Sequence, residues 1–270
     1  MIRSFLSLLV FPALLAAPPA FLREGKGPGI LLIHGFGGNK EVWREAAATL
    51  AKDHTVVRVD LPGSGKTPAP VVKDGAFDLE AIAKDLVALV HREKLEPCLI
   101  VGHSMGGPVA ALTVLQDPNA FRGLVLVDSF LGSIPAGAFE PILAALSKNP
   151  EPTLAAFFGP MATGAAQTQR LAHEALKVPV PVLQGYLRAM TQDYMGARHT
   201  KLALPVVQFA AGPEVIDPAK REAMMGQAGF KNLPDFRIVF FPQAKHWIMW
   251  DEPEGFCKAL RGFERELQKP

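Results

Sequence analysis

The chain has 270 residues, of which 49% are hydrophobic and 20% charged, and this composition excludes an intrinsically disordered protein. Its 28 basic and 26 acidic side chains nearly cancel, and no cluster of Lys and Arg stands out, so nothing indicates a nucleic-acid partner. A chain of this length accommodates one large α/β domain with a full core, or at most two small domains.

Residues 1–20 have the layout of a secretory signal peptide. Arg3 lies near the start, an apolar stretch covers residues 5–17, and small residues and prolines follow. A stable membrane span needs about 20 apolar residues, so this stretch is too short for one. We therefore expect a secreted or periplasmic protein. The alternative is a cytoplasmic protein whose N-terminal strand or helix packs on the domain.

Short apolar runs alternate with amphipathic segments along the rest of the chain. The predicted buried strands cover residues 29–35, 55–61, 98–104, 123–129, 205–211 and 236–241. The predicted helices cover residues 41–52, 77–90, 105–117, 218–228 and 254–267. This alternation predicts one doubly wound, mostly parallel α/β sheet.

One connection is far longer than the others. About seventy residues, 131–203, separate the strands at 123–129 and 205–211, and they contain helical pieces at 140–148 and 165–176. Connections of this length are usually functional. We expect a helical cap inserted at 131–203 into a core formed by residues 21–130 and 204–270.

The run at 98–104 leads directly into a glycine-rich turn around a serine. Residues 102–106 read Gly-His-Ser-Met-Gly, which fits G-x-S-x-G between a strand and a helix. Glycines on both sides of Ser104 permit a sharp, strained turn in which a side chain would collide with the neighbouring chain. This context predicts that Ser104 is a nucleophile at the carboxyl edge of the sheet.

Four motifs in order resemble the α/β-hydrolase superfamily, in particular its capped, esterase-like members. They are HGFGG at 34–38, DLPGSGKT at 60–67, GHSMGG at 102–107 and QAKHW at 243–247. The resemblance covers residues 21–267. The sequence departs from the family at Lys245, which replaces a glycine, and at the first hairpin, which is reduced to AFLREG at 20–25.

The resemblance implies roles for further residues. The family's oxyanion hole maps to the main-chain N–H groups of Phe36 and Met105, and its catalytic base maps to His246. Its loop pattern places the acid nine positions after Pro205, at Glu214. Two alternatives for the acid remain open. Asp128 ends the strand before the insertion, where some members carry the acid, and Asp217 precedes a proline as a helix N-cap does.

The sequence argues against several other chemistries. GSGKT at 63–67 resembles the end of a phosphate-binding loop, but the position that requires glycine is Asp60. No Cys or His spacing indicates a metal, and no cofactor is expected. Cys98 and Cys257 are predicted to be buried free thiols. Tyr186 and Tyr194, in the insertion, are predicted to pack or line a wall.

The predicted function is that of a serine hydrolase that cleaves carboxylic esters, lactones or thioesters of a small apolar substrate. Hydrolysis of a carbon–carbon bond on the same fold is one alternative, because related capped members perform it. A non-catalytic small-molecule binder is the other. The sequence indicates no oligomeric state.

Overall fold

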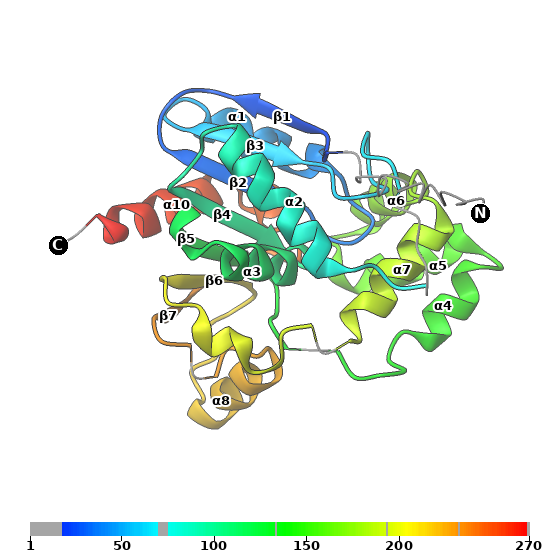
Figure 1. The fold of residues 1–270 in the computed structure, drawn as a ribbon. Helices are drawn as coiled ribbons and strands as arrows, with labels where there is room; N and C mark the ends of the chain where they lie inside the picture. The colour runs from blue at the N-terminus through cyan, green and yellow to red at the C-terminus, as the bar shows by residue number, and fades with distance from the viewer. Residues whose placement is uncertain (1–17, 70–74, 133, 193, 232, 269–270) are drawn as a thin grey trace, which may run out of the picture.

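The computed structural model describes residues 18–69, 75–132, 134–192, 194–231 and 233–268 (Figure 1). Residues 1–17 of the predicted signal peptide lie outside these ranges. Among the helices in the described part of the chain, none has the length and apolar character needed to cross a membrane.

Seven strands of the described chain form one sheet at the centre of the molecule, in the order β1-β3-β2-β4-β5-β6-β7 (Figure 1). Neighbouring strands are parallel except β1, which runs antiparallel to β3. The strands are β1 (Phe21–Glu24), β2 (Gly29–Ile33), β3 (Thr55–Val59), β4 (Cys98–His103), β5 (Phe121–Val127), β6 (Val206–Ala211) and β7 (Phe236–Phe241). The predicted doubly wound, mostly parallel α/β sheet is therefore confirmed.

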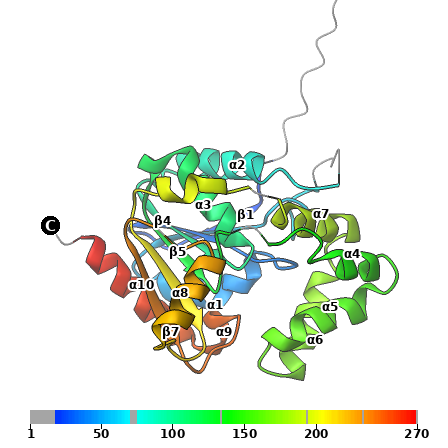
Figure 2. The same cartoon turned by 90° about the horizontal axis from the view of Figure 1, so that it is seen from below.

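Helices cover both faces of this sheet, as its buried central strands require. Figure 2 shows α2 (Leu79–Arg92) and α3 (Gly106–Gln116) on one face, and α1 (Arg44–Leu50) and α10 (Pro253–Leu267) on the other. The side chains of β2, β3 and β4 are buried along their whole length because helices shield both faces.

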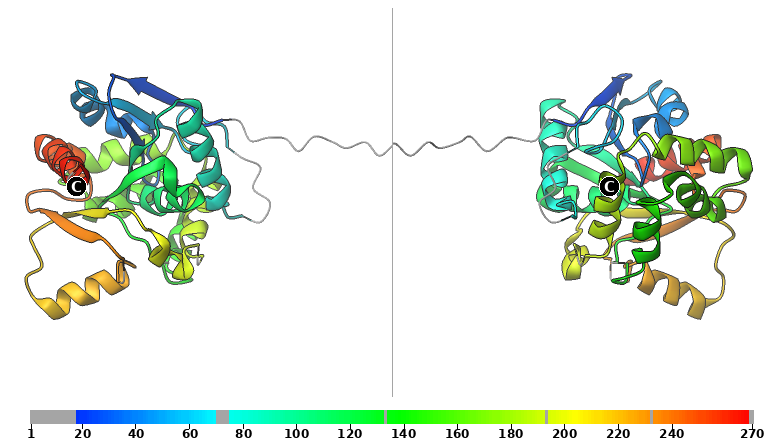
Figure 3. Two further views of the ribbon diagram at one scale, coloured as in Figure 1. Left: turned by 60° about the vertical axis from the view of Figure 1, so that its left-hand side comes forward. Right: turned by 90° about the vertical axis from the view of Figure 1, so that its right-hand side faces the viewer.

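The long connection between β5 and β6 is helical. Figure 3 shows its helices grouped beside the sheet, where they face the viewer in the right-hand view. They are α4 (Glu140–Leu146), α5 (Pro150–Phe158), α6 (Ala165–Ala175) and α7 (Val180–Met190). The sequence did not predict α5 or α7. Both carry proline in the first turn, where the missing N–H costs no intrahelical hydrogen bond.

Shorter elements complete the fold. They are α8 (Pro218–Gln227), α9 (Ile248–Asp251) and the 3₁₀ turns η1 (Lys40–Trp43), η2 (Pro118–Ala120), η3 (Gly159–Met161) and η4 (Gly196–Lys201). The reduced first hairpin is the four-residue strand β1, which pairs with β3 from Phe21 opposite Val59 to Glu24 opposite Val56.

Two sequence predictions about single side chains concern the core. Cys98 and Cys257 are both buried free thiols, and burial raises the pKa of Cys98 to about 12. Cys98 is therefore protonated and unreactive at neutral pH. Tyr186 is buried in a stack on Phe77, and its hydroxyl donates to the Pro62 carbonyl at 2.8 Å.

Candidate active site

Ser104 lies in the turn between β4 and α3 with a strained backbone, because its φ is +51°. Close contacts explain the glycine on each side. A Cβ at Gly102 would lie 2.3 Å from the Gly106 carbonyl oxygen, and one at Gly106 would lie 2.7 Å from that of Ile33. The chain can make this turn only if both positions lack a side chain.

Strand β5 and the residues after it hold the turn in place. The Ser104 N–H donates to the Val127 carbonyl at 3.0 Å. The Ser129 hydroxyl donates to the Ser104 carbonyl at 2.6 Å, and a Cβ at Gly107 would lie 1.9 Å from that hydroxyl. Ser129 was missed by the sequence analysis, although a small hydroxyl residue two positions after a buried strand is a signal for this role.

Asp128 is the carboxylate that the structure brings to His246. Its Oδ2 lies 2.6 Å from His246 Nδ1, and its Oδ1 accepts a hydrogen bond from the Ala211 N–H at 3.1 Å. Asp128 has a φ of +42°, a conformation that a short polar residue tolerates better than most. This turn at the end of β5 directs the carboxylate over the end of β6 and toward His246.

The expected contact between Glu214 and His246 is not formed, and this part of the prediction is corrected. The Glu214 side chain is 60% exposed, and its ion-pair partner is Arg221 at 3.8 Å. Asp217 is the N-cap of α8, where its carboxylate accepts hydrogen bonds from the N–H groups of Ala219 and Lys220. Both carboxylates belong to an exposed loop and helix start.

The surroundings of Asp128 favour its ionised form. Burial opposes ionisation and is the largest single influence on the pKa of Asp128. The hydrogen bond and charge of His246, with the Ala211 N–H, together outweigh it, so the pKa of Asp128 lies below its usual range. An ionised Asp128 accepts the His246 Nδ1–H, which leaves Nε2 of the neutral ring as the proton acceptor.

His34 and His103 have structural roles beside the site. His34 is buried, with Nδ1 donating to the Gly35 carbonyl at 2.8 Å and Nε2 accepting from the Leu61 N–H at 3.0 Å. His103 Nε2–H donates to the His246 carbonyl at 2.9 Å, and its buried Nδ1 has no partner among the described residues. Both rings therefore position neighbouring main chain.

The unpaired Nδ1 of His103 makes stability depend on pH. Burial, with the nearby His246, lowers the pKa of His103 to about 3, against about 6.5 for an exposed histidine. Between these values the unfolded chain binds a proton that the folded chain does not, so acidification destabilises the fold. From pH 7.5 to 5.0 this single group costs about 2 kcal/mol.

We expect His103→Gln, which keeps an N–H donor for the His246 carbonyl, to reduce this acid sensitivity. Urea unfolding at pH 7.5 and 5.0 provides the measurement. The free energy of unfolding of the variant should fall by about 2 kcal/mol less than that of the wild type over this interval. Equal losses in the two proteins would show that His103 binds its proton in the folded state.

The two predicted oxyanion-hole residues lie close to Ser104 in the chain or in space. Met105 follows Ser104 directly, and Phe36 follows Gly35, at which a Cβ would lie 3.0 Å from the Ser104 Cβ. Neither main-chain N–H donates a hydrogen bond to another described residue. This arrangement is typical of amides that bind a ligand oxygen.

The segment GSGKT at 63–67, which resembles the end of a phosphate-binding loop, surrounds a buried carboxylate in the structure. Asp60 is fully buried and accepts hydrogen bonds from Lys40 Nζ at 2.5 Å and from the Lys66 N–H at 2.9 Å. A Cβ at Gly65 would lie 2.3 Å from the same carboxylate. The glycine-rich turn therefore wraps a buried carboxylate.

Ser104, Asp128 and His246 line one cavity of about 190 Å³. The rest of its wall is mainly apolar and comes largely from residues of the insertion and the segment that leads to it. These side chains are Phe36, Phe130, Ile134, Phe139, Phe157, Phe158, Met161, Met190 and Trp247, with His103 beside them. An uncharged apolar group matches these walls.

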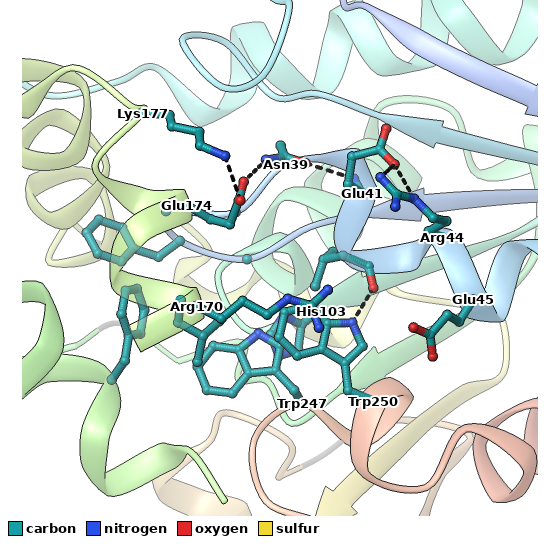
Figure 4. Close-up of a pocket in the computed structure, with 17 residues that line it drawn as sticks. Asn39, Glu41, Arg44, Glu45, His103, Arg170, Glu174, Lys177, Trp247 and Trp250 are labelled. Carbon is teal, nitrogen blue, oxygen red and sulfur yellow. Dashed lines mark hydrogen bonds and ion pairs between the residues drawn. The ribbon is translucent and has the colours of Figure 1, made fainter. Parts of the chain in front are cut away.

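A second cavity of about 340 Å³ lies behind the wall that contains Phe36, His103, Phe158 and Trp247. Figure 4 shows the indoles of Trp247 and Trp250 side by side on its floor, with Arg170 reaching over Trp250. Two ion pairs lie at its rim. Arg44 pairs with Glu41 at 2.9 Å, and Lys177 pairs with Glu174 at 2.6 Å. Ser104 does not line this cavity.

Comparison with known proteins identifies the family to which the sequence is similar. The model of the alpha/beta hydrolase family matches residues 30–259. An sn-1-specific diacylglycerol lipase of Mus musculus is 27% identical over 87% of this chain and 80% of its own length. A pimeloyl-[acyl-carrier protein] methyl ester esterase of Aeromonas hydrophila is 26% identical over 89% of this chain and 97% of its own length.

Solved structures share the fold. A thermophilic esterase from Thermogutta terrifontis superimposes with a TM-score of 0.78 at 22% identity, over 93% of this chain and 94% of that one. A hydrolase from Pseudomonas aeruginosa superimposes with a TM-score of 0.76 at 20% identity, over 91% and 93%. With a family match across most of its length, the chain belongs to the alpha/beta hydrolase family.

Proposed function

We propose that this protein is a serine hydrolase that cleaves carboxylic esters, or the related lactones or thioesters, through an acyl-enzyme. The observation that carries the proposal is the contact of Asp128 Oδ2 with His246 Nδ1 at 2.6 Å, in the same cavity as Ser104. The relatives whose names include lipase and esterase activities support the same class of reaction.

Each residue has a defined step in this reaction. His246 Nε2 takes the Ser104 hydroxyl proton as the oxygen attacks the ester carbonyl, and Asp128 stabilises the imidazolium that forms. The N–H groups of Phe36 and Met105 bind the developing oxyanion, each contributing about 3–4 kcal/mol to lowering the barrier. The protonated His246 then gives its proton to the alcohol that leaves.

The second half of the reaction uses the same groups. Water enters as the alcohol departs, and His246 removes a proton from it during attack on the acyl-enzyme. The tetrahedral intermediate again places its oxygen at Phe36 and Met105. Its collapse releases the carboxylic acid and returns the proton to Ser104.

We further propose that residues 131–203 act as a cap that defines the substrate. Gly37, which follows Phe36, packs so closely on α6 that a Cβ there would lie 2.8 Å from the Ala175 Cβ. The cavity receives Phe157 and Phe158 from α5 and Met190 from α7. A cavity of about 190 Å³ with these walls suits a small apolar acyl group.

Covalent labelling and turnover test the proposed reaction together. The wild type should react with a fluorophosphonate probe and should hydrolyse p-nitrophenyl butyrate with an initial burst of p-nitrophenol. Labelling without turnover of esters, lactones or thioesters would favour hydrolysis of a carbon–carbon bond. Absence of both would favour a non-catalytic binder.

We expect Phe139→Ala to shift the preference of the enzyme toward longer acyl chains, because Phe139 lines the cavity and its loss leaves space. The ratio of kcat/KM for p-nitrophenyl octanoate to that for the acetate should rise about tenfold or more. Phe236→Ala, the same change at a partly buried position outside the cavity, is the control. Equal ratios in both variants would contradict the assignment of this cavity to the acyl group.

A further inference from the structure

The main chain at Lys245 and His246 is held by three hydrogen bonds. The Lys245 N–H donates to Asp251 Oδ2 at 2.9 Å, and the His246 N–H donates to the Met161 carbonyl at 3.3 Å. The His246 carbonyl accepts from His103 Nε2 at 2.9 Å. The contact with Met161 links His246 directly to the inserted helices.

A second link joins the same loop to α6. Gln167, in the first turn of α6, donates from Nε2 to Asp251 Oδ1 at 2.9 Å, so both oxygens of Asp251 are engaged. The other end of the Gln167 amide accepts from the Thr163 N–H at 2.7 Å. These partners fix which end of the amide faces Asp251, because reversing it would place two N–H donors together at Thr163.

Lys245 adds a third contact with the insertion. This residue stands where the family motif has glycine, and its Nζ lies 3.5 Å from the carbonyl oxygen of Pro160, in the 3₁₀ turn that also contains Met161. The segment that carries His246 therefore meets the insertion at three points: the His246 N–H, the Lys245 side chain and the Asp251 side chain.

We propose that Gln167 and Asp251 are positioning residues through which the inserted helices set the location of the His246 ring, an inference that rests on the proposed serine hydrolase function. Gln167 fixes Asp251, Asp251 fixes the Lys245 N–H, and the adjoining peptide places the imidazole between Asp128 and Ser104. The insertion then contributes to the rate of the reaction as well as to the shape of the cavity.

Exchange of the donor and acceptor tests this chain of contacts. Asp251→Asn alone turns an NH₂ group toward the NH₂ of Gln167, and Gln167→Glu alone turns a carboxylate toward that of Asp251. The double variant restores a donor facing an acceptor, while the new Glu still accepts from Thr163 and the new Asn still accepts from Lys245.

We expect each single variant to lower kcat for p-nitrophenyl butyrate about tenfold with KM nearly unchanged, and the double variant to recover to within about threefold of the wild type. The control is Tyr186→Phe, which removes a contact of the insertion with Pro62, away from His246. Its kcat should stay within about twofold of the wild type. Thermal unfolding of all four variants distinguishes displacement of the His246 ring from a loss of stability.

Two kinetic outcomes would overturn the proposal. One is unchanged kcat in both single variants. The other is a double variant whose kcat is as low as that of the worse single variant, although its Tm equals that of the wild type. Either result would show that the Gln167–Asp251 contact serves stability alone.

A wild type that neither reacts with the fluorophosphonate nor hydrolyses esters would contradict the proposed function instead. The position of His246 can then be followed by NMR in protein with ¹⁵N-labelled histidine. Its ring resonances should shift in both single variants and return in the double variant. Resonances of His246 that stay constant in all of them would overturn the positioning role independently of activity.

Discussion

Replacement of Ser104 by alanine should remove ester hydrolysis and covalent labelling by a fluorophosphonate while the fold is retained. Loss of the serine of a comparable triad lowers kcat by about 10⁶-fold. Alanine is smaller than serine and keeps the β-carbon, so the turn between Gly102 and Gly106 keeps its close contacts. Turnover of p-nitrophenyl butyrate and mass spectrometry of the labelled protein give the two measurements.

The control for this variant is Ser147→Ala, which changes an exposed serine of the insertion. It should label and turn over like the wild type. Labelling that persists in Ser104→Ala would identify another nucleophile and would contradict the proposed mechanism.

The second large effect is expected at Asp128, where substitution by asparagine should lower kcat about 10⁴-fold. Asparagine keeps an oxygen and the size of the side chain, but it cannot stabilise the His246 imidazolium and permits the wrong tautomer. Because the pKa of Asp128 lies below its usual range, the wild-type carboxylate stays ionised from neutral pH down to below the ordinary value for aspartate. The loss should therefore be seen across the whole range from pH 5 to 8.

Glu214→Gln and Asp217→Asn complete a matched set with this variant. Both should retain kcat to within about threefold, since Glu214 faces solvent beside Arg221 and asparagine is as good an N-cap as aspartate. Circular dichroism and thermal unfolding confirm folding in each case. A fully active Asp128→Asn variant together with an inactive Glu214→Gln variant would identify Glu214, in the loop after β6, as the catalytic acid.

Local sequence was sufficient for the strands β2 to β7 because they are short, mainly apolar runs with clear ends. All six predicted strands are present, with shifts of at most two residues at their ends, and 236–241 matches β7 in full. The turn at Ser104 could also be predicted from the sequence, because its glycines are required by contacts within a few residues and with the adjacent strand β2.

The carboxylate that contacts His246 could not be singled out from the sequence in the same way. Counting along the 205–218 loop reached Glu214, but the contact that forms joins Asp128 to a residue 118 positions away. The contact is decided by the positive φ of Asp128 and by the Ala211 N–H, which donates a hydrogen bond to the Asp128 carboxylate. Both depend on how β5 and β6 lie side by side.

The insertion was predicted as helical, but only two of the four α-helices in its described residues were placed. Helices α5 and α7 were not placed, and both carry proline in the first turn. Their helical state depends on packing, because Leu154, Phe158, Leu183 and Leu187 are all buried. The contact of Gln167 with Asp251 could not be predicted from the sequence either, since the two residues lie 84 positions apart.

The exposed loop after β6 has a practical consequence for engineering this enzyme. Ile216 is 85% exposed, a Cβ at Gly212 would meet nothing within 4 Å, and α8 buries none of its residues. A peptide tag, a fluorescent reporter group or a surface anchor inserted at residues 213–216 would project into solvent. Such a graft would leave the cavity around Ser104 untouched, which makes this loop the natural point for immobilising the enzyme on a support.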